Sequence, residues 1–240
     1  MWNERNILMM GEESAQRLSE KRVLVVGVGG VGAYAAESIV RAGVGHIVIV
    51  DADDVSETNI NRQLIALHST IGRSKVEVLA ERLKDLNPML DVVPLKEYLR
   101  DERTEEVLSM FHYDYIVDAI DTLAPKVFLL YSSVQRAIPV VSSMGSGGKW
   151  DPSRICIDDI AKSNYCKLAR MVRKRLHHLG VREGIKVVYS DEVVDHSVII
   201  ETEGEANKHS NVGTVSYIPA IFGCMMGSVV IRDLLQISQE

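Results

Sequence analysis

The feature that most constrains this sequence is a glycine-rich turn between an apolar run and a segment of small residues. Residues 23–26 are apolar throughout, and Gly27-Val28-Gly29-Gly30-Val31-Gly32 follows them directly. Residues 33–41 then carry apolar side chains at helical spacing. A strand, a glycine turn and a helix in this order aim backbone N–H groups and the positive end of a helix dipole at one point. The turn therefore predicts an anion-binding site at the end of a buried strand.

The rest of the chain alternates apolar runs with helical patterns, which is typical of a doubly wound parallel sheet. We expect strands at 23–26, 47–51, 92–95, 115–119, 139–142, 154–157 and 186–189. We expect helices at 1–21, 33–41, 73–86, 104–111, 126–137, 160–179 and 218–235. Residues 194–211 are polar and turn-rich, which predicts a mobile segment. The predicted fold class is α/β: a Rossmann-like, doubly wound, mostly parallel sheet with a C-terminal extension of short strands and a buried helix.

The length and composition favour one soluble domain. We expect a single unit over residues 1–240, with a core at 21–150 and an extension at 151–240. Three sparse cysteines without a CxxC pair predict no zinc site and a reducing cytoplasm. The start of the chain has no signal-peptide pattern, and the apolar stretch 218–231 is shorter than the ~20 residues of a membrane span. The net charge of −6 means that any contact with nucleic acid needs a local basic patch.

A carboxylate follows the glycine turn at the spacing of a ribose contact. Asp51 ends the second apolar run, about 20 residues after the turn. Gly27, Gly29, Gly30 and Gly32 are therefore candidate phosphate-binding residues, and Asp51 is a candidate ribose-binding residue. The glycine turn and Asp51 together predict a bound nucleotide, and NAD is the usual ligand of such a turn. The alternative is a glycine turn that binds no ligand.

The residues after the second strand favour a triphosphate over NAD, because they are charged where nicotinamide needs an apolar slot. Arg62 and Lys75 can neutralise the β- and γ-phosphates, and Asp121, after the fourth strand, can hold a divalent metal on them. Such a set supports electrostatic catalysis of attack at phosphorus. The plain alternative is that Arg62 and Lys75 are solvated surface charges. The full polar set of this segment is Asp53, Asn59, Asn61, Arg62, Gln63 and Lys75.

With these elements the sequence resembles the ubiquitin-activating-enzyme-like adenylyltransferase superfamily, the ThiF/MoeB/HesA group. The resemblance implies an enzyme that binds ATP with magnesium, adenylates a carboxylate and releases pyrophosphate. The matching elements, in order, are Gly27-x-Gly29-Gly30-x-Gly32, Asp51-x-Asp53-x-Val55, Asn59-x-x-Arg62-Gln63, Gly72-x-x-Lys75 and Asp118-x-x-Asp121.

The resemblance also implies a role for each matching residue. Arg5, in Arg5-Asn6-Ile7-Leu8-Met9-Met10-Gly11, would reach the nucleotide of a partner subunit, which makes a homodimer part of the active site. Asp121 would hold magnesium and Asp51 the ribose. The implied phosphate contacts are Arg62 and Lys75, and the nucleotide pocket would be shaped by Asn59 and Gln63, together with Asp53.

The later half of the chain resembles one branch of this superfamily, the tRNA threonylcarbamoyladenosine dehydratases. Sulfur-carrier activators in the superfamily usually carry two CxxC pairs for zinc, and this sequence has none. The sequence departs from the branch pattern at Asn164-Tyr165-Cys166, where an Asp-Pro pair is expected. The matching segments are Gly145-Ser146-Gly147-Gly148-x-x-Asp151-Pro152, Asp159-Ile160-Ala161-Lys162-Ser163, Val172-Arg173-Lys174-Arg175-Leu176, Val188-Tyr189-Ser190-x-Glu192 and residues 216–223.

The reaction that this resemblance implies is an ATP-dependent cyclisation of a modified tRNA nucleoside. The threonyl carboxylate of N6-threonylcarbamoyladenosine at tRNA position 37 attacks the α-phosphate of ATP and becomes an acyl-adenylate. The carbamoyl group then closes onto the activated carbonyl and expels AMP, a step in which proximity does much of the work. The resemblance leaves open a requirement for a monovalent cation and a sulfur-transfer protein as partner.

One basic cluster could contact tRNA phosphates in an otherwise acidic chain. It lies within residues 162–178, and a solvated helix face is its plain interpretation. The candidate tRNA-binding residues are Lys162, Arg170, Arg173, Lys174 and Arg175.

Three other functions compete with the tRNA-modifying enzyme. The first is an adenylyltransferase that activates the C-terminal glycine of a ubiquitin-like sulfur carrier; the missing CxxC pairs and the basic segment count against it. The second is a non-catalytic nucleotide-binding protein, which the combination of Arg62, Lys75 and Asp121 disfavours. An NAD oxidoreductase is the third.

Overall fold

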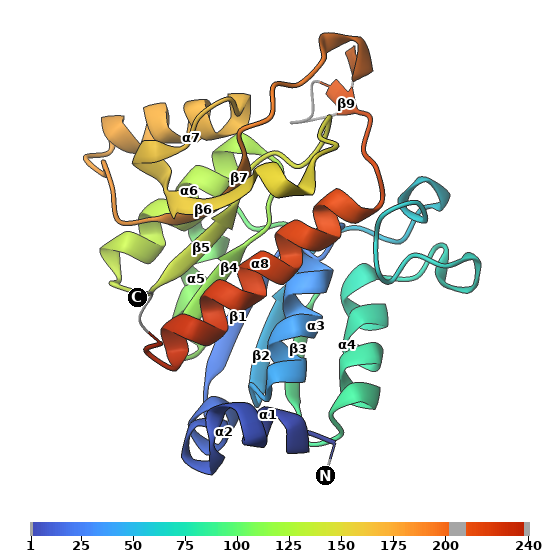
Figure 1. Cartoon of the computed structure of the whole chain (residues 1–240), viewed down its shortest axis with the longest axis vertical. Helices are drawn as coiled ribbons and strands as arrows, with labels where there is room; N and C mark the ends of the chain where they lie inside the picture. Colours follow the sequence, from blue (N-terminus) through green and yellow to red (C-terminus); the bar gives the residue numbers. More distant parts are fainter. Residues whose placement is uncertain (1, 202–209, 238–240) are drawn as a thin grey trace.

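A seven-stranded sheet forms the centre of the chain in the computed structural model, which describes residues 2–201 and 210–237 (Figure 1). The strand order is β3-β2-β1-β4-β5-β7-β6, and β6 alone runs antiparallel to its neighbour. The predicted α/β, mostly parallel sheet is confirmed. The strands are β1 (Arg22–Val26), β2 (His46–Val50), β3 (Asp91–Leu95), β4 (Tyr115–Asp118), β5 (Val140–Ser143), β6 (Ile155–Asp159) and β7 (Lys186–Ser190).

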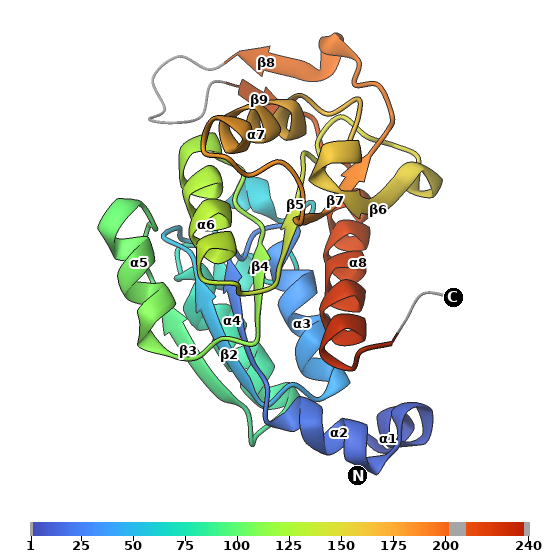
Figure 2. The same cartoon turned by 90° about the vertical axis from the view of Figure 1, so that its left-hand side faces the viewer.

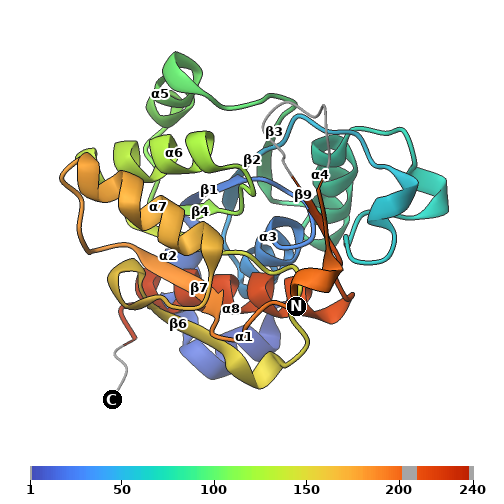
Figure 3. The ribbon, with the colours of Figure 1, turned by 90° about the horizontal axis from the view of Figure 1, so that it is seen from above.

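Helices cover both faces of the sheet, as the end-on view in Figure 3 shows. Each face has its own buried apolar cluster, because side chains alternate along strands that are buried on both sides. One face carries α3 (Gly32–Ala42), α4 (Lys75–Leu86) and α8 (Tyr217–Leu234), and the other carries α5 (Asp101–Met110), α6 (Leu123–Gln135) and α7 (Lys167–His178).

The last helix is a core element that packs closely on α3. A Cβ atom at Gly223 would lie 2.4 Å from the carbonyl oxygen of Val31, and one at Gly227 would lie 2.8 Å from Cβ of Ser38. These two glycines therefore let the helices approach to backbone distance. By length and composition α8 is the one helix of the described chain that could cross a membrane, but its packing on α3 and on the sheet is that of a buried core helix, as predicted.

Three segments differ most from the predicted elements, and α5 and α6 each begin three residues earlier than expected. The expected helix at 1–21 is two short helices, α1 (Glu4–Met10) and α2 (Glu12–Ser19), because Gly11 between them has φ +82°. The expected helix at 160–179 begins only at Lys167, after a short 3₁₀ turn (Ile160–Lys162). Within 194–211, the described residues form a 3₁₀ turn (His196–Val198) and a hairpin of β8 (Ile199–Glu201) and β9 (Ser210–Val212); residues 202–209, where the prediction of a mobile segment also falls, lie outside the described chain.

The segment after residue 150 builds onto the same sheet rather than standing apart. Strands β6 and β7 extend the sheet beyond β5, and α8 returns to pack beside α3 on the face that also carries α4 (Figure 2). The carboxyl ends of the parallel strands therefore share one edge of the sheet, and the loops that leave them lie next to one another.

Candidate nucleotide-binding site

The glycine turn after β1 is an open cradle of backbone N–H groups. Gly27 has φ +85° and a Cβ there would lie 2.7 Å from the carbonyl oxygen of Ala119, so only glycine fits. The helix α3 begins at Gly32 without a side-chain cap. Within the described chain, no hydrogen-bond acceptor is found for the N–H groups of Gly29, Gly30 and Val31. Uncapped N–H groups at a helix start are a site for phosphate oxygens.

Asp51 stands beside this cradle at the end of β2. Its Oδ2 accepts the N–H of Val28 at 2.8 Å and its Oδ1 accepts the N–H of Asp53 at 2.9 Å, so the carboxylate is held in place. Burial raises its pKa, and the nearby Lys75 ammonium opposes that effect. A carboxylate can accept four hydrogen bonds, so Asp51 retains acceptor capacity for ribose hydroxyls.

Lys75 brings a buried positive charge to the same edge. Its ammonium lies 2.6 Å from Oδ2 of Asp53 and 4.0 Å from Oδ1 of Asp51, and its side chain is only 6% exposed. Lys75 is the first residue of α4, where the helix dipole disfavours a cation. Lys75 is therefore a buried ammonium that two carboxylates neutralise at the end of the sheet where the glycine turn lies, and not a solvated surface charge.

The turn at residues 57–64 supplies the remaining predicted groups. Arg62 is partly buried, and its Nη1 donates to the carbonyl oxygen of Thr58 at 2.8 Å and to Oδ1 of Asn61 at 2.7 Å. Asn59 is buried and accepts the N–H of Ser56 at 3.1 Å, which holds the turn. Arg62 and the glycine turn are neighbours, because a Cβ at Gly30 would lie 3.6 Å from Cγ of Arg62.

Gln63 faces the glycine turn from the same segment. Its side chain is buried, and its Nε2 lies 3.5 Å from the position that a Cβ of Gly29 would occupy. Among the described residues its Oε1 has no hydrogen-bond partner. A buried acceptor without a protein donor can accept from a ligand or from an ordered water.

The loop after β4 carries Asp121 on a rigid base. Asp118 is fully buried, and its Oδ2 accepts from Nζ of Lys126 at 2.6 Å and from Oγ of Ser142 at 2.6 Å. Its Oδ1 accepts the N–H of Ile120 at 3.1 Å, which fixes the loop one residue before Asp121. Asp121 itself is exposed at the edge that also carries the glycine turn.

Lys126 is a buried residue of this loop's base that the sequence pattern does not reveal. It is fully buried and forms an ion pair with Asp118, but the sequence presents it only as one polar residue in a helical pattern. The one available signal is a lysine eight residues after an aspartate at a strand end, and that spacing alone does not predict a contact.

The structure does not bring every candidate residue to the cradle. Arg5 lies exposed on α1, at the end of the molecule opposite the glycine turn (Figure 1), so it is not part of the site within one chain. The basic candidates lie on or before α7. Lys162 pairs with Asp158 at 3.0 Å, and Nη1 of Arg173 lies within 3.1 Å of the carbonyl oxygens of Ile160 and Ser163. Arg170, Lys174 and Arg175 are exposed.

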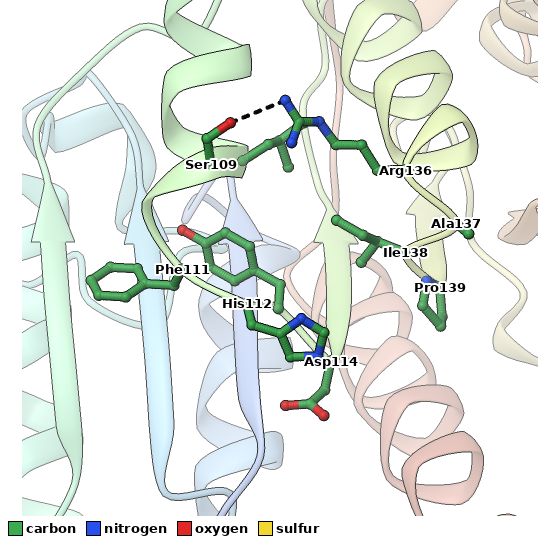
Figure 4. Close-up of a pocket in the computed structure, with 10 residues that line it drawn as sticks. Ser109, Phe111, His112, Asp114, Arg136, Ala137, Ile138 and Pro139 are labelled. Atoms are coloured by element: carbon green, nitrogen blue, oxygen red, sulfur yellow. Dashed lines mark hydrogen bonds between the residues drawn. The ribbon is translucent and has the colours of Figure 1, made fainter.

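A hollow of about 710 Å³ lies at the opposite end of the strands from the glycine turn. Its lining comes from residues 108, 109 and 111–114 before β4 and from residues 136–139 before β5, at the amino ends of these strands. Figure 4 shows Arg136 reaching across it to Ser109, with an Nη2–Oγ distance of 3.1 Å. Because catalytic loops leave the carboxyl ends of the strands, this hollow is separate from the nucleotide cradle.

The whole chain matches the model of one protein family. The ThiF family model covers residues 3–240, so the chain belongs to the ThiF family. The tRNA threonylcarbamoyladenosine dehydratase of Bacillus subtilis is 39% identical over 97% of this chain and 94% of its own length. The protein of the same name from Escherichia coli is 33% identical over 95% and 91%.

The structural likeness extends to a nucleotide complex. The crystal structure of the Escherichia coli tRNA N6-threonylcarbamoyladenosine dehydratase in complex with ATP superposes with a TM-score of 0.87, at 31% identity, over 97% of this chain and 93% of that one. The adenylyltransferase and sulfurtransferase MOCS3 of Culex quinquefasciatus is 36% identical, but over only 55% of this chain and 30% of its own length.

Proposed function

We propose that this protein is an ATP-dependent enzyme that cyclises N6-threonylcarbamoyladenosine at tRNA position 37 through an acyl-adenylate. The observation that carries the proposal is the cradle itself. Three kinds of group lie together at the carboxyl ends of the strands: the N–H groups of the glycine turn that have no acceptor among the described residues, the hydrogen-bonded carboxylate of Asp51 and the buried ammonium of Lys75. The full-length likeness to relatives that bear the dehydratase name supports the choice of substrate.

The chain's own groups suit a triphosphate. The N–H groups of Gly29, Gly30 and Val31 would bind phosphate oxygens, and Asp51 would accept from the ribose. Lys75 would break its ion pair with the exposed Asp53 and bind the phosphates. Arg62 would give up its hydrogen bond to the carbonyl oxygen of Thr58 and bind them as well. Both cations would then offset the negative charge that develops when pyrophosphate leaves.

Asp121 would hold magnesium on the phosphates. Magnesium is usually bound by one or two carboxylates together with substrate phosphates rather than by a complete protein cage. This fits the described chain, which has no group of three or more His, Cys, Asp or Glu side chains that could hold a metal. When bound, magnesium supplies positive charge at the phosphate oxygens.

The chemistry balances without a protein nucleophile. One oxygen of the threonyl carboxylate bonds to the α-phosphorus of ATP while the bond to pyrophosphate breaks. The carbamoyl group then attacks the activated carbonyl, loses a proton, and AMP leaves with that carboxylate oxygen. The nucleoside has lost the elements of one water, and the protein's task is to position and neutralise charge.

Assembly and location complete the proposal. A homodimer would bring Arg5 of one subunit to the nucleotide of the other, since Arg5 cannot reach the cradle of its own chain. The exposed residues Arg170, Lys174 and Arg175 of α7 would contact tRNA phosphates. Three free cysteines suit a cytoplasmic location, where a sulfur-transfer protein could also dock.

A turnover assay tests the proposal. Purified protein, ATP and magnesium are incubated with tRNA that carries the threonylcarbamoyl group, and AMP and the nucleoside mass are measured. We expect AMP release with loss of one water mass, and loss of both products in Arg62→Ala and Asp121→Ala. Lys84→Ala, an exposed change on α4, is the matched control and should keep full activity. AMP release only with a Gly-Gly-ending carrier protein would instead support the sulfur-carrier alternative.

A further inference from the structure

Tyr165 combines a strained backbone with an exposed ring. Its φ is +48°, and the described chain has only three other non-glycine residues with positive φ, none of them aromatic. Bulky residues rarely adopt this conformation, and where it persists the surrounding structure must hold it. The side chain gains little from burial in return, because the residue is 67% exposed.

The turn that carries Tyr165 is anchored on both sides. After it, Sγ of Cys166 accepts the N–H of Ala169 at 3.5 Å and so caps α7. Before it, Arg173 of α7 reaches back to the carbonyl oxygen of Ser163 at 2.8 Å. The ring of Tyr165 is therefore displayed from a fixed backbone rather than from a loose loop.

Positive charge lines the helix that starts beside it. Lys167, Arg170 and Lys174 recur at spacings of three and four along α7, so they share one face, and all three are exposed. None of them takes part in an ion pair among the described residues. An aromatic ring at the end of an unneutralised basic face is an arrangement that suits single-stranded nucleic acid.

The turn also lies at the catalytic edge of the sheet. Sγ of Cys166 is 3.6 Å from the position that a Cβ of Gly145 would occupy, and Gly145 lies two residues after the end of β5. Strand β5 pairs with β4, whose loop carries Asp121, and β4 pairs with β1. Two strand spacings, roughly 10 Å, separate β5 from the strand of the glycine turn.

We propose that the ring of Tyr165 stacks on an unpaired base of the tRNA anticodon loop and so sets the target nucleoside against the nucleotide cradle. This inference rests on the proposed function. The α7 face would bind the backbone phosphates, and Tyr165 would supply the contact that does not depend on charge.

Three substitutions at one position test the stacking. Tyr165→Phe keeps the ring, Tyr165→Ala removes it and keeps the strain, and Tyr165→Gly removes both. We expect KM for the modified tRNA to rise about tenfold or more in the Ala and Gly variants and to stay within about twofold in the Phe variant. The midpoint of thermal unfolding should be about 2–4 °C higher for Tyr165→Gly than for Tyr165→Ala.

Salt dependence separates stacking from phosphate contact. The slope of log(kcat/KM) against log[salt] should be unchanged in Tyr165→Ala and shallower by about 0.7–0.9 in Lys174→Ala. Met110→Ala, at the far edge of the sheet, should change neither KM nor the slope. KM values within twofold of the parent in both Tyr165→Ala and Tyr165→Gly would overturn the inference, as would a change of oligomeric state with KM unchanged. Failure of the proposed function would show differently, as absent turnover in the parent protein.

Discussion

The buried pair of Lys126 and Asp118 gives the sharpest test of how this site is held. Both side chains are 0% exposed, and Asp118 also accepts from Ser142 and from the N–H of Ile120 beside Asp121. Lys126→Met keeps most of the side-chain volume but leaves a buried carboxylate without its countercharge. Removing one partner of such a pair costs about 3–5 kcal/mol of folding free energy. For a chain of this length that is a fall of about 6–20 °C in the unfolding midpoint.

Urea unfolding of four proteins measures this coupling: the parent, Lys126→Met, Asp118→Asn and the double variant. The double variant has no unpaired charge, so it should be less destabilised than the sum of the singles by about 1–3 kcal/mol. Turnover should fall with Lys126→Met even at temperatures where the variant is folded, because the loop of Asp121 loses its anchor. A Lys126→Met variant within about 1 kcal/mol of the parent, or strict additivity in the double variant, would mean that the ion pair does not hold this loop.

Three further predictions follow from single groups. Lys75→Ala should lower kcat/KM about 10²–10³-fold without unfolding the chain, as steady-state AMP release and circular dichroism would show; retained activity would exclude it from the phosphate site. Gly223→Ala places a Cβ 2.4 Å from the carbonyl oxygen of Val31 and should cost about 1–3 kcal/mol in urea unfolding, whereas an unchanged midpoint would mean that α3 and α8 can separate freely. The hydroxyl of Ser132, followed by the guanidinium of Arg136, holds the pKa of Glu105 below its usual 4.5, so its stabilising effect is present above that pH and is lost as the pH falls through the lowered value. The difference in unfolding free energy between the parent and Glu105→Gln should therefore shrink on acidification from pH 5 to pH 3, and a constant difference would contradict this.

The strands and the doubly wound order could be predicted because they depend on local pattern. Strands buried on both faces appear as continuous apolar runs, and β1 and β2 each bury four consecutive residues. Gly43 ends α3 with φ +110°, as a glycine after a helical pattern predicts. The observed bounds of β1, β2 and α3 lie within one residue of the expected ones.

The errors in the helices have local causes that periodicity does not register. Gly11 takes a positive φ and divides the leading helix. Before α7, the side chain of Asp159 accepts the N–H of Ala161, which favours a 3₁₀ turn, and the left-handed Tyr165 stops any helix from continuing to Lys167. The apolar spacing through 160–179 fits a single helix equally well. The interruption before Lys167 can therefore be recognised only from the backbone conformation.

The composition of the site was predictable, but its internal bonds were not. The rule that parallel strands end at one edge places Asp51, Lys75 and Asp121 near one another from sequence alone. Three features depend on tertiary packing. Lys75 pairs with Asp53, Asp118 pairs with Lys126, and the buried Oε1 of Gln63 has no donor among the described residues. The sequence predicts which polar groups lie at this end of the sheet, and the structure shows that Lys75, Asp118 and Asp51 already have partners within the chain.

Isotope labelling of one oxygen atom tests directly whether the substrate carboxylate attacks the α-phosphate of ATP. Modified tRNA labelled with ¹⁸O in both threonyl carboxylate oxygens is turned over with ATP and magnesium, and the nucleotide products are analysed by mass. Attack of the carboxylate on the α-phosphate predicts AMP that carries one ¹⁸O for each cyclised nucleoside. Unlabelled AMP would mean that water, not the substrate, reacts with ATP. ADP with labelled inorganic phosphate would place the attack at the γ-phosphate, and either result would contradict an acyl-adenylate.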